Sequence, residues 1–391
     1  MAKLPWSQQL TDRLAKRKLE GRYRKQRIRF GEQGVNVVID GKQLLSFCSN
    51  DYLGLANHPA LKKAFINIAQ QQGVGAGAAH LLTGHSRYHQ QLEEALADFM
   101  GQQKALLFSS GYQANLGIID GLMARGDVII QDKLNHASLL DGARLSEAEL
   151  LRYPHADMAR LHKRLHTAAM AKHKLIVTDG VFSMDGDIAP LADIITQAKQ
   201  HQAAVFIDDA HGIGVLGEHG RGCVEHYNIA QNDMPIVMGT FGKALGTAGA
   251  FVVADENVIE TLTQQARTYV YTTAQPAAIA AATLVALKLV QDESWRREKL
   301  QTLITQFRVG ANALGLNLKE SATAIQPILI GDDNKAMAIG RRLEQKGLLV
   351  GVIRPPTVPE GSARLRITLS ANHEEHDVTQ LLNALEFAYA H

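Results

Sequence analysis

The sequence predicts an α/β protein with a mostly parallel β-sheet covered by helices on both faces. From about residue 85 onward, short apolar runs alternate with segments of helical periodicity. The runs are apolar along their whole length, which is typical of strands buried on both faces of a parallel sheet. Helices are expected between the strands, as in Tyr88–Met100 and Met158–Ala171. The expected strands are Ala105–Phe108, Asp127–Gln131, Leu175–Thr178, Ala204–Ile207, Ile236–Gly239 and Gly249–Val253.

The chain beyond Pro276 predicts a second, smaller unit. An Ala/Leu-rich helix over Ala277–Asp292 is expected to carry the chain out of the large domain. The rest of the chain, residues 293–391, mixes helical patterns with short strands, which is typical of a small α+β domain. Its strands are expected at Gln326–Ile330, Leu349–Ile353 and Ala363–Thr368.

The first fifty residues are expected to form an N-terminal arm, with a basic helix followed by a hairpin around Val35–Gln43. The pair Asp40-Gly41 supplies residues that a tight hairpin turn favours. We therefore predict three parts: the arm over residues 1–50, a large α/β domain over 51–285, and a small C-terminal α+β domain over 286–391.

The composition is that of an ordinary globular protein, with 46% hydrophobic and 20% charged residues. The formal net charge of +2 provides no general attraction for nucleic acid or membranes, and neither partner is predicted. The basic stretch Arg13–Arg29 is interpreted as a solvated helix face, from which one or two cations could meet an anionic substrate. Cys48 and Cys223 lie far apart and form no zinc-binding pattern. With no signal-peptide pattern at the start, a cytoplasmic location is expected.

Polar residues follow four of the predicted strands, where active sites of open α/β sheets lie. Ser109–Gln113 contains Gly111 at a strand-to-helix turn, which is either an anion site for a phosphate or an ordinary capped helix start. Asp179–Asp187 is a tight turn that either directs Ser183 into the crevice or is simply well formed.

The other two segments carry ionisable groups. Asp208–Gly212 places a carboxylate that could bind a metal, cap a helix or pair with a cationic heterocycle. No second ligand pair stands at a usable spacing from Asp208 and His211, so no metal is predicted. In Thr240–Gly246, Lys243 stands in a glycine-rich turn just past a buried strand. It is either a lysine that extends from the loop into solvent or one held for Schiff-base chemistry.

The order of the four segments is more specific than any one of them. A phosphate turn, a serine turn and Asp-x-x-His are followed by a lysine 35 residues past Asp208. Pyridoxal 5'-phosphate (PLP) needs this set: an amine to form a Schiff base, a carboxylate to keep the pyridine nitrogen protonated, and donors for the ring oxygen and phosphate. The sequence therefore predicts PLP as the cofactor.

Across nearly its whole length the chain resembles the α-oxoamine synthases, PLP enzymes of the type I fold. The motifs that carry this resemblance are Ser49–Leu55, Ser110–Tyr112, Asn135–Ser138, Phe182–Gly186, Asp208–Gly212, Thr240–Lys243, Ile353–Pro359 and Ala363–Arg366. The resemblance implies a mostly parallel seven-stranded sheet flanked by helices. It also implies decarboxylative condensation of an amino acid with an acyl thioester.

The resemblance implies a role for each of several residues. Lys243 would carry PLP and move the proton at the substrate Cα, and Asp208 would pair with the pyridine nitrogen. His136 would stack on the ring and contact substrate. The ring oxygen and the phosphate would be held by Ser183, His211, Gly111, Tyr112 and Thr240.

The substrate side is also implied by the resemblance. Arg354 would bind the amino-acid carboxylate, and Arg24 and Thr357 would contact substrate. Thr272 and Thr273 would reach the PLP of a partner subunit in a homodimer. Ile353–Pro359 and Ser49–Leu55 favour L-alanine and a pimeloyl thioester, of CoA or of a carrier protein, as substrates in biotin biosynthesis.

Three alternatives stay open at this point. One is a sibling condensing enzyme such as 2-amino-3-ketobutyrate CoA ligase, which uses glycine and acetyl-CoA. Another is a PLP aminotransferase, which has no need of a thioester site. The third is a non-catalytic subunit on the same fold, although such subunits lose the lysine that is present here as Lys243.

Overall fold

The computed structural model describes residues 4–390, and within them the larger sheet has seven strands. Their order is β4-β10-β9-β8-β7-β5-β6, and only β10 runs antiparallel to its neighbours. This confirms the predicted mostly parallel seven-stranded sheet. The bounds are β4 Lys104–Phe108, β5 Val128–Asp132, β6 Glu149–Tyr153, β7 Lys174–Asp179, β8 Ala204–Asp208, β9 Ile236–Thr240 and β10 Ala250–Ala254.

One strand of this sheet, β6, was not predicted. It lies at the edge and pairs only with β5 within the described part of the chain. Four of its five residues are exposed or half-buried, and its sequence includes Glu149 and Arg152. An edge strand does not need the continuous apolar run that identified the buried strands, so its pattern was too weak to find.

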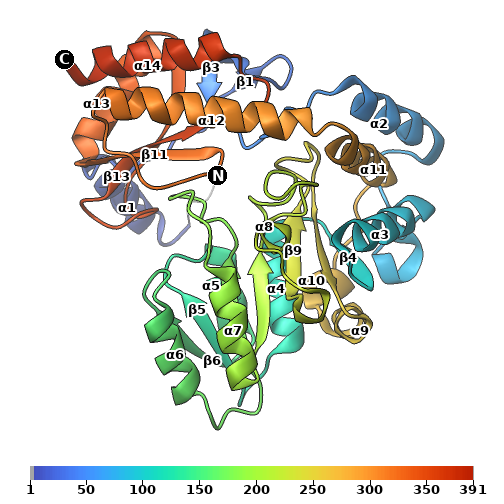
Figure 1. Cartoon of the computed structure of the whole chain (residues 1–391). Helices are drawn as coiled ribbons and strands as arrows, with labels where there is room; N and C mark the ends of the chain where they lie inside the picture. Colours follow the sequence, from blue (N-terminus) through green and yellow to red (C-terminus); the bar gives the residue numbers. More distant parts are fainter. Residues whose placement is uncertain (1–3, 391) are drawn as a thin grey trace.

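Helices cover both faces of the sheet (Figure 1). Successive residues of β8 point to opposite sides, so that Val205 and Ile207 join one apolar cluster and Phe206 joins the other. The first cluster packs against α3 Arg87–Met100, α6 Met158–Thr167, α7 Leu191–His201 and α11 Ala277–Asp292. The second packs against α4 Gly111–Leu122, α5 Ala137–Leu145, α9 Glu256–Gln265 and α10 Arg267–Val270.

The second sheet combines the two ends of the chain. Among the described residues it has six strands in the order β1-β2-β3-β12-β13-β11, and β3 pairs parallel with β12. The predicted hairpin is therefore part of the sheet formed by the C-terminal residues and not a separate arm, while the exact domain boundaries stay a prediction. The strands are β1 Arg29–Phe30, β2 Asn36–Ile39, β3 Lys42–Phe47, β11 Ile325–Gly331, β12 Leu348–Ile353 and β13 Ala363–Thr368. The accompanying helices are α12 Trp295–Ala313, α13 Asp333–Gln345 and α14 Glu375–Ala390.

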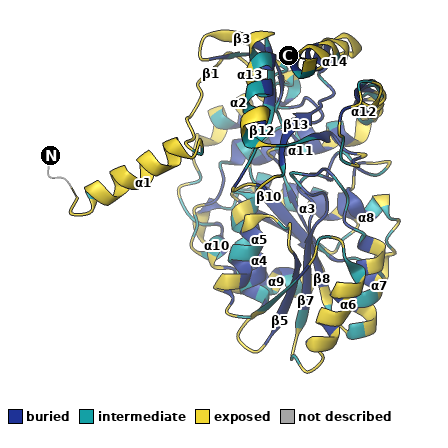
Figure 2. Ribbon diagram, turned by 90° about the vertical axis from the view of Figure 1, so that its left-hand side faces the viewer, coloured by how far each residue is buried: buried dark blue, intermediate teal, exposed yellow. Residues whose placement is uncertain are grey.

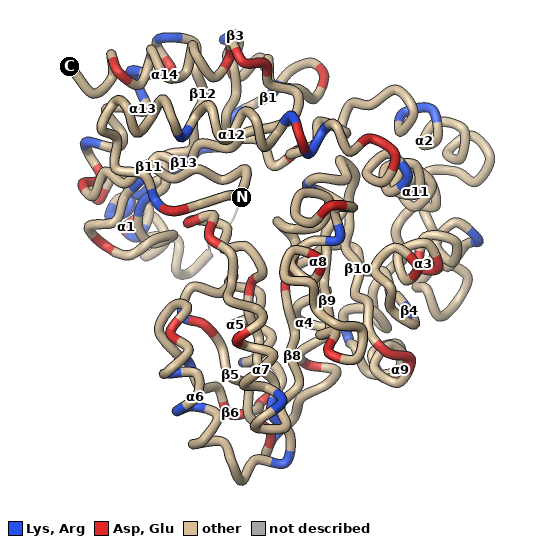
Figure 3. The backbone as a smooth tube through the Cα atoms, viewed as in Figure 1, with Lys and Arg blue, Asp and Glu red and all other residues tan. Residues whose placement is uncertain are grey.

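The basic N-terminal helix is α1, Ser7–Leu19, and it has no buried residue. Figure 2 shows it projecting from the body of the chain. Lys16, Arg17 and Lys18 lie in its last turn. Elsewhere acidic and basic positions are interleaved along the backbone (Figure 3). Over residues 4–390 no helix combines the length and the apolar character needed to span a bilayer.

The remaining helices are short or peripheral: α2 Pro59–Gln72, the π-helical turn η1 His80–Gly84, α8 Cys223–His226 and the 3₁₀ turn η2 Gln231–Asp233. The parallel strands β5, β7, β8 and β9 end at one edge of the larger sheet, and at that edge Asp179 lies directly beside Asp208. This edge carries the candidate site.

Candidate active site

A cavity of about 800 Å³ lies at the carboxyl ends of the parallel strands. All eight residues predicted to bind the cofactor line it, although they come from segments more than a hundred residues apart. Those residues are Gly111, Tyr112, His136, Ser183, Asp208, His211, Thr240 and Lys243. Residues from the C-terminal part of the chain, Pro356, Thr357 and Arg366, also line it, so the cavity lies between the two sheets.

Lys243 stands in the tight turn that follows β9. The backbone N–H of Gly246 donates to the carbonyl of Lys243 at 3.0 Å, and Thr247 N donates to the carbonyl of Phe241 at 2.8 Å. Gly246 has a φ of +68°, and a Cβ there would lie 2.4 Å from the backbone nitrogen of Ala56. Only glycine allows this turn to lie against residues 55 and 56, which fixes where the lysine side chain begins.

Lys243 is half-buried and lines the cavity. Burial lowers its pKa, and Arg366 acts in the same direction, while the carboxylates of Asp208 and Asp179 oppose them. A lysine with a lowered pKa is more often in the neutral form that a nucleophile or base requires.

Asp208 ends β8 and is 8% exposed. Its Oδ2 accepts a hydrogen bond from Asn115 Nδ2 at 2.6 Å, and its Oδ1 accepts one from Ala210 N at 3.1 Å. Asn115 also donates to Ser138 Oγ at 2.8 Å. These contacts orient the carboxylate into the cavity, and Asn115 was not found from the sequence because nothing local distinguishes it from other polar residues of α4.

His211 is held by the Ser49–Leu55 motif. Its Nδ1 lies 2.6 Å from the hydroxyl of the fully buried Tyr52. Burial lowers the pKa of His211 well below its usual value, and the positive charges of Lys243 and Arg366 act in the same direction. The imidazole is therefore neutral and has one ring nitrogen available for a neutral hydrogen bond within the site.

The amino end of α4 and the end of β9 meet at another part of the cavity. A Cβ on Gly111 would lie 2.6 Å from Thr240 Cγ2, so glycine is needed for this approach. The Oγ1 of Thr240 is buried and has no hydrogen-bond partner among the described residues. Backbone N–H groups at a helix start together with an unpaired hydroxyl suit an anion. Tyr112 lies nearby, and its hydroxyl donates to Asp141.

His136 is the N-cap of α5, and its backbone N–H donates to the carboxylate of Asp179 at 3.1 Å. Its Nδ1 lies 2.7 Å from Ser138 Oγ. Asp179 lies at the end of β7 and is 4% exposed, and burial together with the neighbouring Asp208 raises the pKa of its carboxyl group. Asp179 is thus a second buried carboxylate of the site, to which the sequence assigned no role.

The Ser183 turn is held by two buried arginines of β13. Arg366 Nε donates to the carbonyl of Ser183 at 2.7 Å, and Arg364 donates to the carbonyl of Met184 and forms an ion pair with Asp185. Arg364 and Arg366 are two residues apart on the strand and therefore face the same side. Two arginines on one side of an otherwise largely apolar predicted strand were a usable sign of a nearby site, but the sequence analysis assigned no role to Arg366.

Four predicted residues do not line this cavity. Arg24 lies at its edge, where Nη2 donates to Thr357 Oγ1 at 3.0 Å. Arg354 donates instead to the carbonyl of Gly21. Thr272 and Thr273 lie away from the cavity, in the segment after α10, and Thr273 forms a β-bridge with Ala79.

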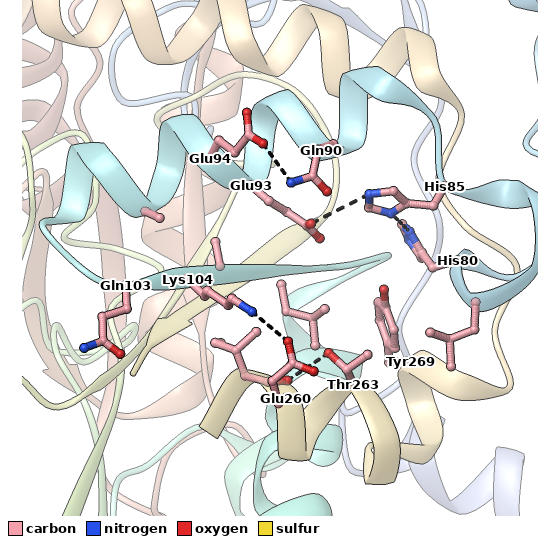
Figure 4. Close-up of a pocket in the computed structure, with 15 residues that line it drawn as sticks. His80, His85, Gln90, Glu93, Glu94, Gln103, Lys104, Glu260, Thr263 and Tyr269 are labelled. Carbon is pink, nitrogen blue, oxygen red and sulfur yellow. Dashed lines mark hydrogen bonds and ion pairs between the residues drawn. The ribbon is translucent and has the colours of Figure 1, made fainter. Parts of the chain in front are cut away.

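A second cavity, of about 510 Å³, lies between α3, β4 and α9 (Figure 4). None of the predicted site residues lines it. Burial lowers the pKa of His80 to about 3 and raises the pKa of Glu93 to about 8. Both groups are therefore neutral near pH 7, and the one lysine among the described residues that line this cavity, Lys104, is paired with Glu260 at 2.7 Å.

Comparisons with known proteins agree with this arrangement. The family model for aminotransferase class I and II matches residues 42–385. The 8-amino-7-oxononanoate synthase of Nitrosococcus oceani is 56% identical over 372 residues, which cover 95% of this chain and 98% of that protein. The chain belongs to the 8-amino-7-oxononanoate synthase family. The resemblance seen in the motifs is thereby confirmed.

Two solved structures support the fold of this 8-amino-7-oxononanoate synthase family member. The synthase of Francisella tularensis is 32% identical, covers 89% of this chain and 98% of its own, and has a TM-score of 0.78. A structure of serine palmitoyltransferase (SPT) with PLP is 31% identical to this chain, and the match covers 99% of both chains with a TM-score of 0.93. The prediction of a type I PLP fold is confirmed.

Proposed function

We propose that this protein is a PLP-dependent 8-amino-7-oxononanoate synthase. It would condense L-alanine with a pimeloyl thioester, of CoA or of a carrier protein, and release CO₂ and the free thiol in biotin biosynthesis. The observation that carries the proposal is the single cavity that brings together all eight predicted cofactor residues, in a chain 56% identical to a named synthase.

The cavity fits PLP at each end of the cofactor. The unpaired Thr240 hydroxyl and the start of α4 at Gly111 suit the phosphate. At the other end, Asp208 is oriented by Asn115 and suits a protonated ring nitrogen. Lys243 lies in the same cavity as both and would form the covalent bond to the cofactor aldehyde.

When bound, PLP supplies an electron-withdrawing ring that stabilises negative charge on the Cα of the amino acid. Asp208 keeps the ring nitrogen protonated, which maintains that withdrawal. Once the amine of alanine has displaced Lys243 from the cofactor carbon, the freed amine of Lys243, whose pKa is lowered by burial, would take the Cα proton and later return a proton to the product. His136 lines the same cavity and would donate a hydrogen bond to the ketone oxygen as the β-keto acid loses CO₂.

The alanine carboxylate needs a cation, and the structure favours Arg366 over Arg354 for this role. Arg366 lines the cavity, where its guanidinium donates to Ser183, Thr368 and Asn50. Arg354 does not line the cavity and donates to the carbonyl of Gly21. A guanidinium binds a carboxylate through two parallel hydrogen bonds. We propose that Arg366 receives the carboxylate, and that Arg24 and Thr357 contact the acyl substrate at the cavity edge.

A homodimer is part of the proposal. Thr272 and Thr273 do not line the cavity of their own chain, and Leu82 and Tyr271, which respectively follow Ala79 and precede Thr273 of the β-bridge by a few residues, are 78% and 74% exposed. Large apolar side chains this exposed are typical of a surface that another chain covers. A second copy there would allow the two threonines to reach its phosphate site. The biosynthetic role favours a cytoplasmic location.

The test is to mix the purified protein with PLP, L-alanine and a panel of acyl thioesters, and to identify the products by mass spectrometry. We expect 8-amino-7-oxononanoate from the pimeloyl thioester, and no product from a Lys243→Ala variant. Product from glycine and acetyl-CoA alone would indicate a 2-amino-3-ketobutyrate CoA ligase instead. Conversion of PLP to pyridoxamine phosphate by alanine alone would indicate an aminotransferase.

A further inference from the structure

His155 lies outside the cavity but bridges two segments that carry site residues. It follows β6, and its Nδ1 lies 3.2 Å from each carboxylate oxygen of Asp132. Its Nε2 lies 2.7 Å from Oδ2 of Asp187. Asp132 is 1% exposed at the end of β5, and Asp187 closes the turn after β7. One imidazole thus joins the loop after β5 to the turn after β7.

Asp132 fixes the backbone of its segment through its carboxylate, and Asp187 fixes its own through its backbone carbonyl. Asp132 Oδ1 accepts a hydrogen bond from Leu134 N at 2.8 Å, which shapes the loop that leads to His136. Phe182 N donates to the carbonyl of Asp187 at 3.0 Å and closes the turn that presents Ser183. The ring of Phe182 packs edge-on against His155, with 4.4 Å between ring centroids.

The bridge requires both ring nitrogens to donate. Burial acts to lower the pKa of His155, but hydrogen bonds to Asp132 and Asp187 outweigh it and raise the pKa to about 10. The imidazole is therefore a cation near pH 7, and only the cation has an N–H on both nitrogens. No uncharged side chain of similar size can donate in both directions at this separation.

We propose that His155 is a positioning residue that sets the separation between the His136 loop and the Ser183 turn. The inference rests on the proposed function, because it assumes that His136 and Ser183 contact the PLP ring. From the other side, Arg366 and Ser321 hold the Ser183 turn through the carbonyls of Ser183 and Gly186. His155 supplies the matching restraint from the large sheet.

The chain offers a matched control at the opposite end of the same strands. His173 Nδ1 lies 2.9 Å from Asp127 Oδ1, and these residues directly precede β7 and β5. His173→Gln removes a histidine–aspartate pair from the amino ends of the strands, while His155→Gln removes one from the carboxyl ends. A general loss of stability is expected from both substitutions, whereas an effect on the site is expected from His155→Gln alone.

The experiment measures the PLP dissociation constant by absorbance titration and hydrogen–deuterium exchange of residues 133–138 and 182–187 in PLP-free protein. For His155→Gln we expect PLP affinity to fall about tenfold and exchange of both segments to rise at least about fivefold, with kcat falling about tenfold, because small misplacements of site residues have effects of this size. For His173→Gln we expect PLP affinity, exchange of both segments and kcat each to stay within about twofold of the wild-type value. The conservative variant Asp187→Asn keeps an oxygen that can accept from Nε2 of His155. Its loss of PLP affinity and its rise in exchange should therefore be smaller than those of His155→Gln.

Equal effects of the two histidine substitutions, or unchanged exchange and PLP affinity in His155→Gln, would overturn the inference. If His155→Gln does not fold, Asp187→Asn is compared with His173→Gln, and an effect of Asp187→Asn on exchange and PLP affinity no larger than that of His173→Gln overturns the inference. Exchange and PLP affinity do not depend on which product is made. Failure of the wild-type protein to form 8-amino-7-oxononanoate would therefore count against the proposed function while leaving this test of His155 valid.

Discussion

The choice between Arg366 and Arg354 can be tested by replacing each with methionine, which keeps an unbranched apolar stem and removes the charged guanidinium. A hydrogen bond to a charged group contributes about 1.5–3 kcal/mol, so loss of the carboxylate clamp should raise KM for alanine about 10- to 150-fold. We expect this for Arg366→Met, because Arg366 lines the cavity. For Arg354→Met we expect less than about a threefold change, because its guanidinium contacts the carbonyl of Gly21.

The assay is steady-state condensation with alanine varied at a saturating pimeloyl thioester, and then the reverse. Arg366 also holds the Ser183 carbonyl, so a fall in kcat is expected together with the rise in KM for alanine. The KM for the thioester should change little in Arg366→Met. A rise of tenfold or more in KM for alanine in Arg354→Met, with Arg366→Met unchanged, would refute the structural argument and restore the sequence-based expectation.

Three further predictions concern the cofactor end, the lysine turn and pH. Thr240→Val should lower PLP affinity about tenfold but leave the melting temperature of PLP-free protein unchanged or higher, because the buried hydroxyl has no partner in the chain; a melting temperature lowered by several degrees would contradict this. Gly246→Ala should cost about 1–3 kcal/mol of folding stability, measured by urea unfolding, because of its positive φ and the contact with Ala56. Because folding raises the pKa of His155 to about 10, the hydrogen bonds of its charged imidazole contribute in full to the free energy of unfolding below about pH 6.5. This contribution is lost as the pH rises through about 10. The stability difference between wild type and His155→Gln should therefore shrink over that range, and a difference that grows would show the sign to be wrong.

Much of the site could be predicted because its signals are local in sequence. Lys243, Asp208 and Ser183 each follow a continuous apolar run, and such runs indicate buried parallel strands whose carboxyl ends share one edge. Gly111 and Gly246 indicate backbone conformations or close approaches that other residues do not allow. The chemistry of the cofactor then follows from the types of residue at that edge.

The tertiary structure decided what depends on contacts between distant segments. The hairpin at β2 and β3 is recruited into the sheet of the C-terminal residues by pairing with β12, and no local pattern encodes that pairing. Asn115 and Tyr52 orient Asp208 and His211 from segments about 90 and 160 residues away in the chain. Which partner a polar side chain finds is set by the fold around it, and burial makes that choice matter energetically.

The surroundings of Arg354, Arg366 and His155 also depend on contacts between distant segments, so they could not be predicted from the sequence. The sequence resemblance assigned the carboxylate to Arg354 and gave Arg366 no role, and only the fold shows that Arg366 lines the cavity while Arg354 donates to Gly21. His155 is one of sixteen histidines, and nothing in its sequence neighbourhood shows that two carboxylates from other segments surround it. The sequence by itself determined the fold class and the cofactor and predicted the candidate Schiff-base lysine, because short apolar and glycine-containing patterns indicate them. The tertiary structure decided which side chains hold Asp208 and His211 and which arginine lines the cavity, because those contacts depend on distances between segments that the order of residues does not contain.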